Sequence, residues 1–127
     1  ELKAWKKMQK ILTQFNATKN HPGVNECIKT IETVFTKAAQ PERAQGMEKY
    51  LRNQFSCLGL SAPQRRELFK HEVLPQINDL FKRDQVSRAQ KELELKYIVS
   101  KLWHLKEREF QYIGMDLLTR YVPKLFD

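Results

Sequence analysis

The chain has 127 residues, which suits one domain or part of one. Hydrophobic residues make up 41% of it, enough for a core, so a disordered tail is excluded; no run of about 18 apolar residues is present, so no membrane-spanning helix is expected. The formal net charge of +8 favours an anionic partner such as nucleic acid or a membrane surface, although ordinary solubility accounts for this charge about equally well.

The first predicted helix covers residues 2–17, where apolar residues recur every three to four positions and lysines occupy the other face. Because arrays of stacked helices need covered ends, we expect this helix to be a cap; a helix lying on a membrane surface is the alternative. A loop that contains Pro22 and Gly23 separates it from a second predicted helix over residues 24–39, with the same apolar spacing.

A third helix is predicted over residues 41–55. Pro41 suits its first turn, because proline lacks a backbone N–H and has a fixed φ. The residues expected to face inward are Ala44, Met47, Leu51 and Phe55. The connection 56–60 follows, and in it Gly59 supplies the freedom to turn.

The fourth predicted helix covers residues 62–82, and Ser61 and Gln64 have the spacing of a capping box at its start. Pro75 should bend or interrupt this helix near Leu74, because proline removes a backbone donor and clashes with the preceding turn. Two further helices are expected after a polar loop. They cover residues 89–105 and 107–122.

The predicted fold class is all-α, since no segment alternates apolar and polar residues long enough to indicate a strand. The helices come in pairs with short links, a pattern typical of stacked antiparallel helical hairpins. Cys27 and Cys57 form no CxxC pair, and the histidines lack ligand spacing, so we expect reduced, structural thiols in an intracellular protein of the cytoplasm or nucleus. No metal site and no cofactor are predicted.

Two motifs occur in order along the chain. The first is GMEKYLRNQF at 46–55 continued by SCLGLSAPQRRELF at 56–69, and the second is LWHLKEREFQY at 102–112. Together they resemble the AlkD-type DNA alkylation repair proteins, which share the elements Met-x-x-Tyr, Phe-x-x-Leu-Gly, Pro-x-Arg-Arg and Arg-Glu-Phe-Gln. The resemblance spans about residues 24–122.

This resemblance implies a HEAT-like α-solenoid curved around double-stranded DNA, of which residues 1–127 would be the N-terminal part. It also implies a DNA repair glycosylase that excises positively charged N3- or N7-alkylated purines. In that family an Asp carboxylate and flanking Trp rings stabilise the cationic sugar that forms as the base leaves. They belong to a Trp-Trp-Asp-like segment that would follow residue 127, so no catalytic residue is assigned and this chain alone is expected to be inactive.

A DNA-binding edge is implied by the same resemblance. Its residues are Tyr50, Arg52, Ser61, Ala62, Pro63 and Arg66. From the residues alone, the start of the fourth helix would present free N–H groups and a positive dipole end to a phosphate, within reach of Arg66. The alternative for the helix start is plain helix capping with solvated arginines. The alternative for Tyr50 is a half-buried side chain that closes the core. Arg65 lies about 100° from Arg66 around the helix and suits a surface ion pair.

The remaining motif residues suit structural roles. We expect Trp103 to pack between repeats rather than stack on a substrate, Arg108 and Glu109 to join an inter-helix polar network, and Asp116 to cap or pair with a neighbouring helix. An apolar end face would allow self-association. Its expected residues are Phe110, Leu117, Leu118 and Tyr121. Two other functions stay open, a non-catalytic helical-repeat nucleic-acid binder and a protein-binding scaffold.

Overall fold

The structure is a computed structural model that describes residues 22–125, so the predicted helix over 2–17 lies outside the described residues. The described part is helical, without a β-strand, and this confirms the all-α class. One isolated bridge joins Ser56 to Glu107. The elements in chain order are α2 (Pro22–Lys37), α3 (Pro41–Tyr50), α4 (Ala62–Leu68), the π-helical segment η1 (Phe69–Val73), α5 (Leu74–Lys82), α6 (Arg88–Trp103) and α7 (Arg108–Leu125).

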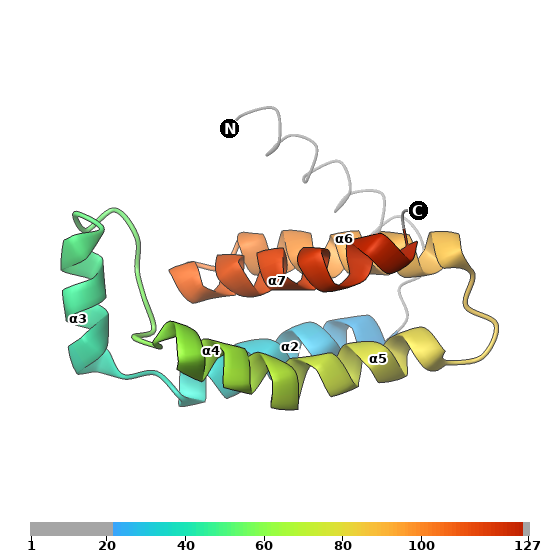
Figure 1. Ribbon diagram of the computed structural model, residues 1–127, viewed down its shortest axis with the longest axis horizontal. Coiled ribbons are helices and arrows are strands. Elements are labelled where there is room, and N and C mark those ends of the chain that lie inside the picture. The colour runs from blue at the N-terminus through green and yellow to red at the C-terminus, as the bar shows by residue number, and fades with distance from the viewer. Residues whose placement is uncertain (1–21, 126–127) are drawn as a thin grey trace.

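Two antiparallel helical hairpins stack on each other (Figure 1). One pairs α2 with the continuous α4–η1–α5 helix, and the other pairs α6 with α7. These paired helices confirm the predicted arrangement of stacked hairpins. The exception is α3, which stands crosswise at one end of the two layers (Figure 1). Within the described residues, none of the helices has the length and apolar character needed to cross a membrane.

The core lies between the two hairpins, where apolar faces from both layers meet. The rings of Phe35 and Phe110 contact each other edge to face, with centroids 6.3 Å apart. The rings of Phe81 and Tyr121 also contact each other edge to face, with centroids 5.3 Å apart. Aromatic pairs in this geometry add to the stabilisation that burial of their surface provides. They join α2 and α5 of one hairpin to α7 of the other.

The apolar end face predicted on α7 is wrong for most of its residues. Phe110 and Leu117 are fully buried, Tyr121 is 3% exposed and Leu118 is partly buried. The physical reason is that this stripe packs inward on the other hairpin, as the two aromatic pairs show. Of the four residues, Leu118 alone keeps part of its surface exposed, and self-association stays a prediction.

Pro75 acts on the fourth helix as expected. The helix widens into η1 immediately before Leu74, whose N–H bonds to the carbonyl of Phe69 five residues earlier. A proline removes one donor and clashes with the carbonyl four residues before it, and a π-helical turn relieves that clash. The interruption near Leu74 is therefore confirmed.

The third helix is shorter than predicted, because α3 ends at Tyr50. Arg52 and Asn53 have φ values of 58° and 56°, in the left-handed region that ends a helix. The N–H of Asn53 bonds back to the carbonyl of Glu48 at 2.7 Å. As a result Phe55 lies outside the helix and is 38% exposed, so its predicted inward position is wrong.

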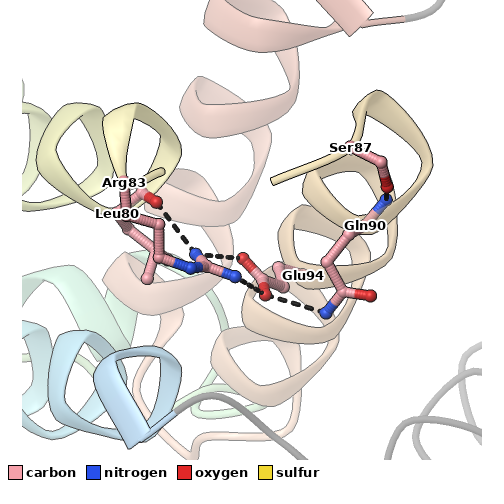
Figure 2. A network of polar contacts seen from close by, with 5 residues as sticks. All are labelled: Leu80, Arg83, Ser87, Gln90 and Glu94. Atoms are coloured by element: carbon pink, nitrogen blue, oxygen red, sulfur yellow. Dashed lines mark hydrogen bonds and ion pairs between the residues drawn. The ribbon is translucent and has the colours of Figure 1, made fainter. Parts of the chain in front are cut away.

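A buried carboxylate fastens the connection from α5 to α6 (Figure 2). Glu94 has no exposed side-chain surface, and its two oxygens accept hydrogen bonds from the Arg83 guanidinium. Gln90 donates a further bond of 2.9 Å to the same carboxylate, and Arg83 also bonds the carbonyl of Leu80. Ser87 caps α6 by accepting from the N–H of Gln90. This cluster sets how the second hairpin follows the first.

Candidate nucleic-acid interface

The connection between α3 and α4 is held by two glutamates. Glu48 of α3 accepts a hydrogen bond of 2.9 Å from the N–H of Cys57. Glu109, fully buried at the second position of α7, accepts bonds of 2.8, 2.9 and 3.2 Å from three consecutive N–H groups. They belong to Leu58, Gly59 and Leu60. Its place in the first turn of α7 also suits a negative charge, because the helix dipole is positive there.

Gly59 lies against the start of α3 and has a φ of 93°. A Cβ on this residue would lie 2.1 Å from the carbonyl oxygen of Gln40 and 2.7 Å from the nitrogen of Ala44. The N–H of Gln40 in turn bonds the carbonyl of Leu58 at 2.8 Å. The predicted turn at Gly59 is confirmed, and close backbone packing gives a second reason why only glycine fits.

The start of α4 has the predicted capping box. The N–H of Gln64 bonds Ser61 Oγ at 3.3 Å, and the N–H of Ser61 bonds Gln64 Oε1 at 3.0 Å. The N–H groups of residues 58–61 and of Gln64 all have partners, and Pro63 has no N–H. In the described structure this leaves the Ala62 N–H as the one unpaired backbone donor between residues 58 and 64. The expectation of several free N–H groups for a phosphate is therefore wrong, because Glu109 and the capping box already bind them.

Three of the predicted DNA-binding residues border three separate hollows rather than one pocket. Tyr50 borders a hollow of about 510 Å³ between α3 and α7, together with Arg43 and Tyr112. Pro63 borders one of about 410 Å³ beside the C-terminal end of α2. Arg66 borders a third of about 480 Å³ between α4 and α7. The arginine therefore faces α7, a helix in which no DNA contact is predicted from the sequence.

Tyr50 is 87% exposed, so the alternative of a half-buried tyrosine that closes the core is wrong. Arg52 is exposed as well, just after the end of α3. Ser61 and Ala62 are partly buried, and Pro63 and Arg66 are exposed. The side chains that can reach a ligand are thus Tyr50, Arg52, Pro63 and Arg66.

Arg65 bridges α4 to α7. Its Nε lies 3.8 Å from Asp116 Oδ2, and its guanidinium stacks 4.8 Å from the ring centre of Tyr112. The side chain is 16% exposed, so the expected ion pair is present but partly buried. The expected pairing of Asp116 with a neighbouring helix is confirmed by the same contact.

The sequence shows which family this arrangement belongs to. A scan against protein families matches residues 31–126 to the family described as DNA alkylation repair enzyme. The match includes the α3–α4 connection and the helices around it. The chain belongs to the DNA alkylation repair enzyme family. Comparison with curated proteins found no match. Comparison with solved structures found none either.

In this DNA alkylation repair protein, Arg108 and Glu109 form the expected inter-helix polar network. The N–H of Arg108 bonds the carbonyl of Ser56 at 2.8 Å. Its guanidinium lies 4.4 Å from the ring centre of Phe55 and 5.3 Å from that of Tyr112. Sequence reasoning placed both residues in a network but missed their partner, the α3–α4 connection. The available signal was an acidic residue in the first turn of the helix predicted over residues 107–122.

The two cysteines of the repair protein are free and buried. Burial raises the pKa of both thiols to about 11, and the nearby carboxylates of Glu109 and Glu48 add to the effect at Cys57. Both thiols are therefore protonated at neutral pH, as expected of structural cysteines. Trp103 is partly buried at the end of α6, where its carbonyl accepts a bond of 3.4 Å from Gln111.

Proposed function

We propose that this chain forms one wall of the DNA-binding cleft of a glycosylase that excises positively charged N3- or N7-alkylated purines from double-stranded DNA. The observation that carries the proposal is the family match over residues 31–126. An alkylated purine of this kind leaves readily because its positive charge is neutralised as the bond to the sugar breaks. The enzyme's main task is then to grip the damaged duplex and stabilise the cationic sugar.

The carboxylates that the described structure buries serve its architecture. Glu94 binds Arg83, and Glu109 binds three backbone N–H groups. A carboxylate that stabilises a cationic sugar must face the DNA, and these two face their protein partners. Asp116 is partly exposed and pairs with Arg65. We therefore assign this chain a part in binding, and none of its residues a part in the chemistry.

Exposed side chains along α3 and α4 supply that binding. Arg52 and Arg66 offer guanidinium groups to backbone phosphates, which such groups bind through two parallel hydrogen bonds. Tyr50 offers a ring that can pack on the sugar or base surface of the minor groove. The Glu109 contacts hold the connection between these two groups of residues in place.

The intact protein should release N7-methylguanine from a methylated duplex, and Tyr50→Ala or Arg66→Ala should slow this release about tenfold or more at limiting protein concentration. Lys29→Ala, at an exposed position on α2, is the matched control and should behave like the unmodified protein. Base release is measured by chromatography of the free purine.

Each result that departs from this expectation has its own meaning. Duplex binding without any base release would contradict the glycosylase proposal and favour a non-catalytic nucleic-acid binder. Absence of any DNA binding would favour a scaffold for another protein. Full activity of both variants would show that α3 and α4 do not face the DNA.

A further inference from the structure

A hollow of about 480 Å³ lies between the α4–η1 helix and α7. It is lined by Arg66, Phe69, Asp116, Thr119 and Arg120. The side chains of both arginines and of Thr119 are exposed. Across residues 22–125, neither the Arg66 nor the Arg120 guanidinium takes part in an ion pair or hydrogen bond. Two arginines from separate helices thus face one concave surface with their donors available.

The lining of this hollow includes one carboxylate, that of Asp116. Asp116 is paired with Arg65, whose Nε lies 3.8 Å away and whose guanidinium also stacks on Tyr112. The lining holds two arginines against one carboxylate, so the hollow keeps a net positive charge and attracts anions. The Arg65 contacts join α4 to α7 without using Arg66 or Arg120.

The donors in the hollow match the chemistry of a phosphate group. A guanidinium presents N–H groups in a planar fork that binds two phosphate oxygens at once, and a threonine hydroxyl can donate to a third. Arginine and threonine side chains are among the usual partners of DNA phosphates. Phe69 adds an apolar surface to the lining, and an apolar surface nearby strengthens charged hydrogen bonds.

We propose that Arg66 and Arg120, assisted by Thr119, bind one backbone phosphate of DNA between α4 and α7. This inference rests on the proposed function and extends it, because it makes α7 part of the DNA-binding surface. The DNA backbone then crosses both hairpins of the fold at this point.

The test compares Arg66→Gln, Arg120→Gln and the double variant in duplex binding at several salt concentrations. Each single change should weaken binding about tenfold, because a charge-assisted hydrogen bond is lost. The double change should weaken it by less than the product of the two, because both residues bind the same phosphate. The plot of log affinity against log salt should become less steep by about 0.9 in the double variant, the value for one phosphate contact.

Lys29→Gln is the matched control, and unchanged thermal unfolding of all variants confirms that the fold is intact. If Arg120→Gln binds the duplex like the unmodified chain with the same salt slope, the inference is overturned while the proposed function stands. If the unmodified chain fails to bind any duplex, both are overturned. If the variants lose binding of inorganic phosphate while duplex affinity is unchanged, the hollow takes a free anion and the DNA assignment is wrong.

Discussion

At residue 109 a fully buried carboxylate accepts hydrogen bonds from three consecutive backbone N–H groups. Such a cluster of N–H groups is an anion-binding arrangement, and here the anion comes from the protein itself. The motif predicted a polar network at Glu109 but not its partners. Backbone N–H groups carry no sequence signature, and Leu58 lies 51 residues away along the chain.

We expect Glu109→Gln to reduce the free energy of unfolding by about 3 kcal/mol, because the amide replaces an acceptor by a donor that faces the N–H groups. Urea denaturation measures the change. Glu107→Gln is the matched control two residues earlier, where the side chain is only partly buried, and it should change stability little. Equal stability of both variants would show that the carboxylate does not hold the connection.

Cys57 lies in the same connection, and burial with the carboxylates of Glu109 and Glu48 raises its pKa from 9.0 to about 11. The unfolded chain therefore releases this thiol proton at lower pH than the folded protein. Its contribution to stability is complete below pH 9 and is lost as the pH rises from about 9 to about 11. Urea midpoints across this range should fall less steeply for Cys57→Ala than for the unmodified chain. Identical slopes would contradict the shifted pKa.

At the scale of elements, helix positions followed from apolar periodicity, while helix ends depended on backbone conformation. The sequence predicted an interruption of the fourth helix near Leu74, and the structure has η1 there. The early end of α3 was missed, since Arg52 and Asn53 adopt left-handed conformations without a glycine to signal them. The crosswise orientation of α3 was also not predicted, because it depends on contacts of the connection with distant α7.

Alanine substitution should have opposite effects on stability at Gly46, within α3, and at Gly59, which packs against the start of α3. Gly59→Ala should destabilise the protein by about 3 kcal/mol or more, since its Cβ would overlap the backbone at Gln40 and its φ disfavours any side chain. Gly46→Ala has open space within a helix and should stabilise the protein by about 0.5–1 kcal/mol. Thermal unfolding separates the two outcomes. A neutral Gly59→Ala would mean that the connection does not pack against α3 as described.

At the scale of the whole molecule, the two hairpins stack on each other and α3 stands crosswise at one end (Figure 1). The exposed Arg43 borders the hollow between α3 and α7, and Arg66 and Arg120 border the one between α4 and α7. The sequence predicted the family, the paired helices, and a DNA-binding role for residues in and beside α3 and α4. They did not indicate Arg120, because its nearness to Arg66 arises only when α7 packs beside α4. The prediction of an exposed apolar end face was wrong for a similar reason. The apolar stripe of α7 is buried against the other hairpin.

We propose above all that this chain binds DNA through phosphate contacts. Fluorescence anisotropy of a labelled duplex, titrated with the chain at salt concentrations from about 50 to about 200 mM, tests it directly. Two or more phosphate contacts predict that affinity falls at least about tenfold across this range. An affinity that does not change with salt, or no binding at the lowest salt, would contradict the claim.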